Sequence, residues 1–100
     1  MKLLKFSAVW CGPCKQQHRI FNEKPLSIEL VDFDIEDDGN YVIERTNGNN
    51  NSEPIENIVN MFRIKNVPTM ILVDDDFKEL YRWMGVTQPQ IIEEKINSLK

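Results

Sequence analysis

Hydrophobic positions in the first third of the chain predict a strand, a helix and a second strand. Residues 2–9 form a mainly apolar run of strand length, which stops where Gly12 and Pro13 interrupt it. Proline suits the first turn of a helix, so a helix is expected from Pro13 to about Asn22, ending before the next proline. Apolar and polar residues alternate again over residues 27–35, which predicts a second strand, parallel to the first.

The second half of the chain predicts a helix, a two-stranded hairpin and a last helix. Apolar residues at helical spacing predict a helix over 54–62. Residues 70–73 are typical of a short buried strand, and residues 78–84 of its antiparallel partner, because only a short polar turn joins the two. Thr87 and Gln90 have the spacing of a capping box, so Thr87 is expected to cap the last helix.

Between the second strand and the second helix, residues 37–53 are expected to form a long polar loop. Aspartates and a glycine open this segment and an asparagine-rich run nearly closes it, which favours a loop with room for a short turn at residues 41–43. The remaining order, strand-helix-strand-helix-strand-strand-helix, predicts an α/β fold. We expect a single domain over residues 1–100, with a four-stranded mixed sheet and helices on both faces.

Charge and composition exclude several classes of protein. Residues 1–24 carry five bases and one acid, and residues 25–56 carry nine acids and one base. No Lys/Arg cluster is dense enough to indicate nucleic-acid binding. No apolar run approaches the roughly 20 residues that a membrane span needs, so no membrane partner is expected. The N-terminal residues lack the pattern of a signal peptide, which favours a cytoplasmic location, where a structural disulfide is improbable.

Both cysteines lie in one turn, Cys11-Gly12-Pro13-Cys14, at the junction of the predicted strand and helix. The N-terminus of a helix has unpaired N–H groups and a partial positive charge, which stabilise a thiolate and make it reactive near neutral pH. The two intervening residues allow a small disulfide loop, and Pro13 stiffens it. We expect Cys11, nearer the strand and more exposed, to attack a substrate disulfide, and Cys14, more buried, to resolve the mixed disulfide.

A metal site and two inert cysteines are the alternatives for this turn. Zinc generally needs four ligands, whereas Cys11, Cys14 and His18 supply three at most. A strand–turn–helix context is the one that a redox motif requires, so neither alternative is favoured and no metal is expected.

Three segments resemble the thioredoxin family. Trp10 to Lys15, WCGPCK, resembles the thioredoxin active site, and residues 66–69, Asn-Val-Pro-Thr, resemble the family's cis-proline loop. Gly85 matches the family's glycine near the substrate groove. The resemblance extends over residues 2–99 and implies a minimal thioredoxin fold without a metal or organic cofactor.

The resemblance also implies a substrate-binding surface around the cysteines. Val67 and Pro68, joined by a cis bond, are expected to pack beside them and to present the backbone of residue 67 to a substrate strand. Trp10 is expected to cover one side, with Gly12 and Pro13 in the turn itself. The alternatives are that Pro68 only begins a strand and that Trp10 is a core residue.

One departure from the family concerns a charge. Lys5 stands where the family has a buried acid, and Asp32 corresponds best to a family lysine. We hypothesise a charge swap, in which Lys5 and Asp32 pair near Cys14, Asp32 acts as the base and Lys5 favours the thiolate. Alternatively, Lys5 extends its charged end to solvent.

Three further departures from the family concern the start of the chain, the first helix and an insertion. The chain begins directly at the strand of the motif, as in a shortened, glutaredoxin-like layout. The first helix lacks the family's interior proline, and His18 shares a predicted face with Cys14 and Phe21, where it is either close to the resolving thiol or a packing residue. Residues 37–53 form an insertion, which is either a partner-recognition loop or a tolerated surface loop.

These features favour a monomeric protein-disulfide reductase. The resemblance implies an NADPH-dependent thioredoxin reductase as electron donor and protein disulfides as clients, with ribonucleotide reductase as a typical example. A glutaredoxin-like reductase is a second possibility, in which Lys15, Arg19 and Lys65 meet the carboxylates of glutathione. A binding subunit whose cysteines are incidental is a third.

Overall fold

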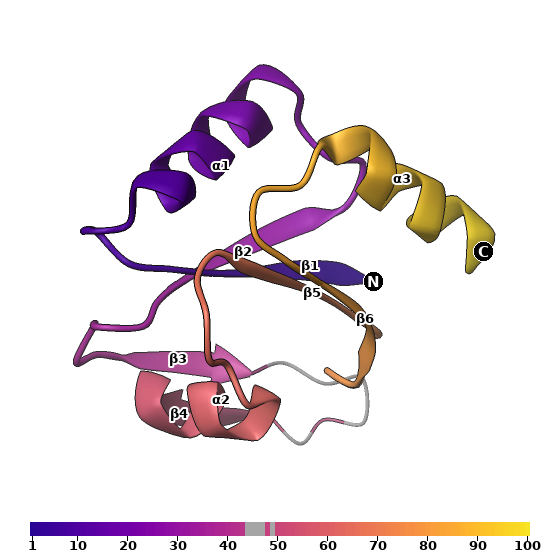
Figure 1. The fold of residues 1–100 in the computed structure, drawn as a ribbon. Helices are drawn as coiled ribbons and strands as arrows, with labels where there is room; N and C mark the ends of the chain where they lie inside the picture. Colours follow the sequence, from indigo (N-terminus) through magenta and orange to yellow (C-terminus); the bar gives the residue numbers. More distant parts are fainter. Residues whose placement is uncertain (44–47, 49) are drawn as a thin grey trace.

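The computed structural model describes residues 1–43, 48 and 50–100, and its main sheet has four strands in the order β2-β1-β5-β6 (Figure 1). Strand β1 pairs in parallel with β2 and antiparallel with β5, which in turn pairs antiparallel with β6. The predicted α/β fold with a four-stranded mixed sheet is therefore confirmed. The strands of this sheet and the helices that pack on it are β1 (Lys2–Ser7), α1 (Gly12–Glu23), β2 (Glu29–Asp34), α2 (Ile55–Phe62), β5 (Thr69–Val73), β6 (Glu79–Met84) and α3 (Pro89–Ser98).

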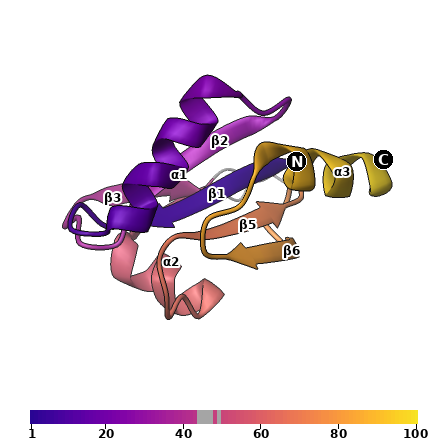
Figure 2. The same ribbon diagram turned by 45° about the horizontal axis from the view of Figure 1, so that its top comes forward.

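Helices cover both faces of the sheet, as Figures 1 and 2 show, with α1 and α3 on one face and α2 on the other. Alternation along β1 explains this arrangement, because neighbouring side chains of a strand point to opposite faces. Leu3 packs in the apolar cluster with Phe21 of α1 and Ile92 of α3, whereas Leu4 packs in the cluster with Ile58 of α2. Both faces of β1 are therefore buried along the middle of the strand. No helix among the described residues is long and apolar enough to cross a membrane.

The segment predicted as a long loop contains a second, two-stranded sheet, which corrects that expectation. Strand β3 (Asn40–Ile43) pairs antiparallel with β4 (Asn51–Pro54). Ile43 is fully buried in the cluster beneath α2, and the ring of Tyr41 lies 4.8 Å from that of Phe33. Because β4 has no large apolar side chain, these contacts of β3 are the ones that pack the hairpin against the core. The rest of the predicted loop, residues 44–47 and 49, lies outside the described residues.

The last helix begins one residue later than predicted, and the prediction of a capping box at Thr87 and Gln90 is wrong. The N-cap residue is Gln88, which makes no side-chain capping bond, and Pro89 follows it. The hydroxyl of Thr87 donates instead to the carbonyl of Gly85 at 3.1 Å, and its backbone N–H donates to Gln17 at 2.7 Å. Thr87 is thus held by Gly85 and by Gln17 of α1, so its hydroxyl does not cap α3.

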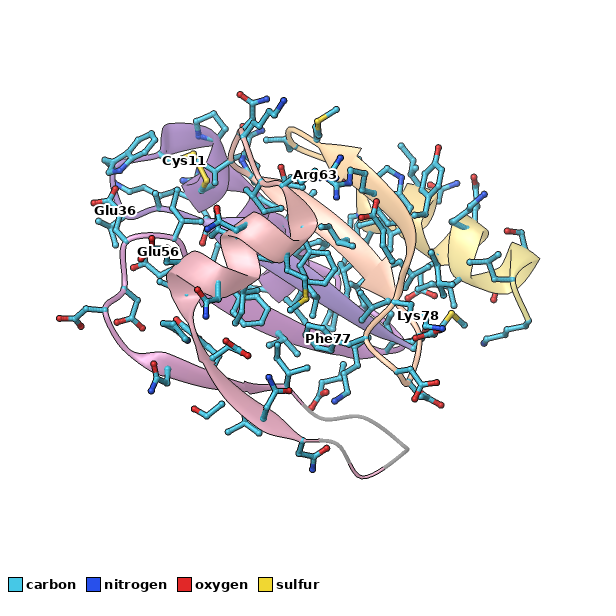
Figure 3. All side chains as sticks on the ribbon, turned by 90° about the horizontal axis from the view of Figure 1, so that it is seen from below. Cys11, Glu36, Glu56, Arg63, Phe77 and Lys78 are labelled. Carbon is cyan, nitrogen blue, oxygen red and sulfur yellow. A yellow bond between two sulfur atoms is a disulfide. The ribbon has the colours of Figure 1, made fainter. Side chains whose placement is uncertain are left out.

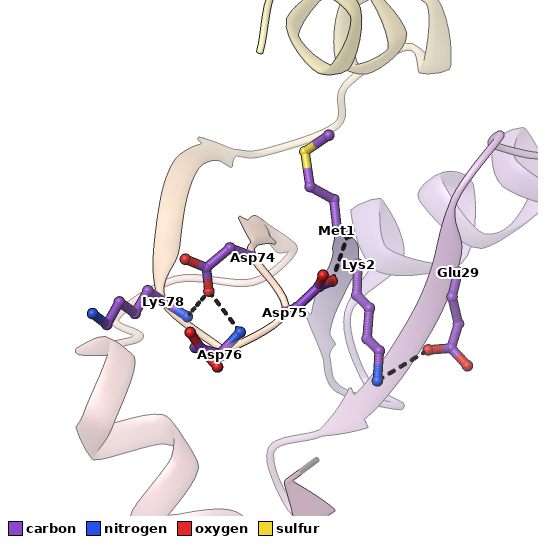
Figure 4. Close-up of polar contacts among 7 residues, drawn as sticks. All are labelled: Met1, Lys2, Glu29, Asp74, Asp75, Asp76 and Lys78. Carbon is purple, nitrogen blue, oxygen red and sulfur yellow. Dashed lines mark hydrogen bonds and ion pairs between the residues drawn. The ribbon is translucent and has the colours of Figure 1, made fainter. Parts of the chain in front are cut away.

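The turn between β5 and β6 is closed by one carboxylate (Figure 4). Asp74 Oδ1 accepts the backbone N–H groups of Asp76 and Lys78, each at 2.9 Å. Nearby, Lys2 Nζ lies 3.4 Å from Glu29 Oε2 and links β1 to β2. This end of the sheet is opposite the cysteines, which follow the other end of β1.

The pairing of β5 with β6 shifts register close to this turn. Leu72 pairs with Tyr81, but Val73 pairs with Glu79, so Leu80 is an extra residue in β6. Such a bulge bends the strand locally and interrupts its ladder of backbone hydrogen bonds.

Candidate active site

A disulfide joins Cys11 and Cys14 at the N-terminus of α1 (Figure 3), and their Cα atoms lie 5.2 Å apart. Cys11 is the N-cap residue, and its Sγ accepts the backbone N–H of Cys14 at 3.2 Å. Its own N–H donates to the carbonyl of Ala8 at 3.1 Å, which fixes the turn to the end of β1. An N–H group aimed at Sγ stabilises negative charge on that sulfur, so the geometry favours a Cys11 thiolate once the bond is reduced.

The two cysteines are almost equally buried in this oxidised form, contrary to the expectation that Cys11 is the more exposed. Cys11 is 4% exposed and Cys14 is 3% exposed. Both pack against Ala8, with Ile35 and Val67 closing the cluster from neighbouring segments. The position of Cys11 at the helix cap therefore distinguishes the two sulfur atoms, and their exposure does not.

The cis-proline segment lies beside the disulfide, as the resemblance implied. The Val67–Pro68 peptide bond is cis, and the carbonyl oxygen of Val67 lies 3.7 Å from Cys11 Sγ. Gly85 donates its backbone N–H to the carbonyl of Pro68 at 2.8 Å and has a φ of 87°, a left-handed conformation that favours glycine. The structure thus brings Val67, Pro68 and Gly85 together with Cys11.

A groove of about 380 Å³ runs from Trp10 to this segment. Trp10 is 65% exposed, so it is not a core residue but one wall of the groove. Gly12 and Pro13, which precede Cys14 in the turn, are also exposed. The residues that line the groove are Trp10, Ile35, Ile64, Lys65, Asn66 and Val67.

The predicted pair of Lys5 and Asp32 is present. The two residues are in register on β1 and β2, and Lys5 Nζ lies 2.8 Å from Asp32 Oδ1. Lys5 is 4% exposed, so its ammonium does not extend to solvent as the alternative proposed. Both residues and Cys14 line one cleft of about 600 Å³ on the α1 side of the sheet. The geometry therefore allows this pair to influence the environment of Cys14.

The inward face of α1 differs from the predicted one by one residue. His18 is exposed at the rim of the same cleft, and its Nε2 lies 3.2 Å from Asn22 Nδ2. The buried residues of the helix are Cys14, Gln17 and Phe21. The predicted face did not include Gln17; the signal for it is its helical spacing from Cys14 and Phe21, which is easily missed because glutamine is usually a surface residue.

The basic residues considered for glutathione are divided between two hollows. Lys15 and Arg19 line the cleft beside Cys14, whereas Lys65 lines the groove beside Trp10. Among the described residues, no group of three or more His, Cys, Asp or Glu side chains is arranged to hold a metal ion.

Comparisons with known proteins agree with this geometry. A family model described as a thioredoxin-like domain matches residues 2–100. No curated protein matches the sequence. Among solved structures, the thioredoxin of Schistosoma mansoni is 20% identical, with a TM-score of 0.69, and the match covers 99% of this chain and 76% of that one.

Two further structures show the same fold. Thioredoxin-2, a component of the malaria parasite's protein secretion machinery, is 20% identical, with a TM-score of 0.67, and the match covers 97% of this chain and 81% of that one. A thioredoxin-fold protein from Helicobacter pylori is 20% identical, with a TM-score of 0.72, and the match covers 86% of this chain and 60% of that one. The fold and the Cys11–Cys14 pair together support a thiol–disulfide oxidoreductase. Because the family model spans nearly all of its residues, the chain belongs to the thioredoxin-like domain family.

Proposed function

We propose that the protein reduces disulfide bonds in other proteins by dithiol exchange. The observation that carries this proposal is the position of Cys11, which caps α1, accepts a backbone N–H on its sulfur, and lies beside both the Val67 carbonyl and the groove along Trp10. An extended client segment in that groove would present its own disulfide to Cys11 while its backbone meets residue 67.

In the proposed cycle, the Cys11 thiolate attacks one sulfur of the client disulfide, and the other client sulfur leaves as a thiolate. Cys14 then attacks Cys11 Sγ, which breaks the mixed disulfide and releases the second client thiolate. The client gains two electrons, and the Cys11–Cys14 disulfide forms. A dithiol donor must supply two electrons to begin the next cycle.

Asp32 and Lys5 are proposed to assist the second step. Cys14 must lose its proton before it can attack, and the Asp32 carboxylate, which shares its cleft, is the proposed acceptor, directly or through water. The Lys5 ammonium, held 2.8 Å from Asp32, would favour the Cys14 thiolate. If Asp32→Asn leaves the rate of client release unchanged in a single turnover, this role for the pair is wrong.

The electron donor and clients are proposed from the resemblance of the WCGPCK segment. An NADPH-dependent thioredoxin reductase would supply electrons, the clients would be protein disulfides such as that of ribonucleotide reductase, and the site of action would be the cytoplasm. We propose that the protein acts as a monomer. Glutathione is the less favoured donor, because Lys15 and Arg19 lie in a different hollow from Lys65.

The central test is turnover of a protein disulfide with each electron source. We expect NADPH oxidation with thioredoxin reductase and much less with glutathione and glutathione reductase; the reverse result would favour the glutaredoxin-like alternative. Cys11→Ser should abolish turnover, whereas Cys14→Ser should accumulate the mixed disulfide, detectable by mass spectrometry. A variant with both cysteines changed to serine that keeps its biological activity would instead support a binding subunit.

A further inference from the structure

Gln17 is a fully buried polar residue in the helix that carries the cysteines, three positions after Cys14. A buried amide is unfavourable unless both of its polar atoms find partners. Here a single residue satisfies both: Gln17 Nε2 donates to the carbonyl of Thr87 at 2.9 Å, and Gln17 Oε1 accepts the backbone N–H of Thr87 at 2.7 Å. The side chain therefore clamps α1 to the loop between β6 and α3.

The clamped loop leads back to the disulfide through a series of hydrogen bonds. Thr87 Oγ1 donates to the carbonyl of Gly85, and Gly85 donates its N–H to the carbonyl of Pro68. Pro68 follows Val67, whose carbonyl lies 3.7 Å from Cys11 Sγ. Gln17 contacts none of the reacting atoms. Through these hydrogen bonds, however, it holds the loop in one position relative to the two sulfur atoms.

Exposed apolar side chains lie on either side of the glycine in this loop. Met84 is 68% exposed and Val86 is 37% exposed, with Gly85 between them. A polypeptide that reaches Cys11 across the cis-proline segment would also meet these residues. Apolar packing has little directionality, whereas hydrogen bonds to both the N–H and the C=O of Thr87 hold the backbone of that residue in one orientation.

We propose that Gln17 is a positioning residue for polypeptide clients. It preorganises residues 84–87, so that a client does not lose binding free energy in ordering them. This inference rests on the proposed reductase function and adds that two classes of substrate depend differently on Gln17. A polypeptide disulfide needs the loop, whereas a small disulfide that contacts only the sulfur atoms does not.

The test compares two variants of Gln17 with matched variants of its exposed neighbour Gln16. Gln17→Met keeps the length of the side chain but removes both hydrogen bonds. The steady-state kcat and KM are measured with a disulfide-containing polypeptide and with the small uncharged hydroxyethyl disulfide. We expect Gln17→Met to raise KM for the polypeptide about fivefold, as for a lost hydrogen bond, with kcat and the small-disulfide rate changed by less than about twofold. Gln16→Met should change neither.

Gln17→Glu gives a readout that a purely structural role would not produce. Its carboxylate accepts the Thr87 N–H but places a second acceptor against the Thr87 carbonyl, whereas the protonated acid restores a donor. Burial raises the pKa of a carboxyl group, so the KM defect, relative to the native protein at the same pH, should shrink as the pH falls from about 8 to about 5. Gln16→Glu should show no such recovery.

Three results would overturn the inference. The first is an unchanged polypeptide KM in folded Gln17→Met, and the second is an equal loss of activity with the polypeptide and with the small disulfide. The third is a loss of activity with the polypeptide that is explained entirely by a smaller fraction of folded protein, as measured by urea denaturation. If Gln17→Met does not fold, Thr87→Val takes its place. That change removes only the hydroxyl bond to Gly85 and should also raise the polypeptide KM alone. Failure of the proposed function itself would be seen separately, as absence of turnover with both substrates in the native protein.

Discussion

Lys5 Nζ lies 2.8 Å from Asp32 Oδ1, and the two partners differ sharply in exposure, at 4% for the lysine side chain and 55% for the aspartate. The ammonium is thus the buried member of the pair. An uncompensated charge costs far more in the interior than in water, so the two partners are not equivalent in their effect on stability.

We predict that Asp32→Asn destabilises the fold more than Lys5→Met does. Asp32→Asn leaves a buried ammonium without its counter-charge and should lower the free energy of unfolding by about 1–2 kcal/mol, less than for a fully buried pair because water reaches Asp32. Lys5→Met leaves a solvated carboxylate and fills the same volume with apolar atoms, so its effect should stay within about 1 kcal/mol. Urea denaturation at neutral pH checks both values, and equal losses would contradict the asymmetry.

A second prediction concerns the pH dependence of stability. Arg82 donates to both carboxylate oxygens of Glu79, at 2.6 and 2.7 Å, and to the carbonyl of Phe62 at the end of α2. The hydrogen bonds from Arg82 hold the pKa of Glu79 below its ordinary value of 4.5. A carboxyl group with a lowered folded-state pKa stabilises the fold above its unfolded-state pKa, and this contribution is lost as the pH falls through the folded-state value.

Glu79→Gln should therefore lower the free energy of unfolding by about 0.5 kcal/mol at pH 7, a small value because the pair is partly exposed. The difference from the native protein should decline below pH 4.5 and vanish in stronger acid. Urea denaturation over a pH series measures it. Glu23→Gln, at an exposed position at the end of α1, is the control and should show no comparable decline. A pH-independent difference would exclude the ion pair as its cause.

A third prediction concerns the residue that ends α2. Arg63 has a φ of 53° and a ψ of 51°, a left-handed conformation that disfavours residues with a Cβ atom. Arg63→Gly should raise the free energy of unfolding by about 0.5–1 kcal/mol, because glycine adopts this conformation without strain. Arg63→Ala keeps the Cβ atom and should give no gain. Thermal and urea denaturation of the two variants distinguish the backbone effect from loss of the guanidinium.

A fourth prediction concerns clients with a net charge. Figure 3 shows Glu36 and Glu56 at the end of the molecule that carries Cys11, and Glu56 lines a hollow with Asp37 and Asp38 next to Ile35. Acidic side chains close to a reaction site accelerate encounters with cations at low ionic strength. Glu36 and Glu56 should therefore raise the rate for basic disulfide peptides relative to acidic peptides of equal length, against the opposing charge of Lys65 in the groove.

Glu56→Lys should reduce the preference for the basic peptide by about threefold in dilute buffer, and about 1 M salt should abolish the difference. Glu23→Lys makes the same change in net charge at the far end of α1 and should have little effect. If both variants alter the preference equally, net charge and not the position of Glu56 determines it. The measured quantity is the second-order rate constant for each reduced variant with each peptide.

Short-range sequence patterns were sufficient for most of the main sheet and for the reactive turn. Alternation at Val31, Phe33 and Ile35 correctly indicated one buried face, and all three pack in the cluster beneath α2. The CxxC spacing and Pro13 located the start of α1 to within one residue. These features depend on neighbours a few residues away, which the sequence shows directly.

The features that the sequence did not reveal depend on contacts between distant segments. Strand β4 contains only polar residues and proline, and it exists because it pairs with β3, whose Ile43 is buried elsewhere in the core. Gln17 is buried because Thr87, 70 residues later, satisfies its amide. The same contact prevents Thr87 from capping α3. A local pattern holds no information about such partners.

The extra residue in β6 has a consequence for self-association. Strand β6 lies at an edge of the sheet, where unpaired backbone groups offer a template to the strand of a second molecule. An added strand needs an even ladder of donors and acceptors, and the register shift at Leu80 breaks that ladder. The bulge therefore leaves this edge a poor starting point for the stacked sheets of amyloid, although Leu80, Tyr81 and Met84 are exposed along it.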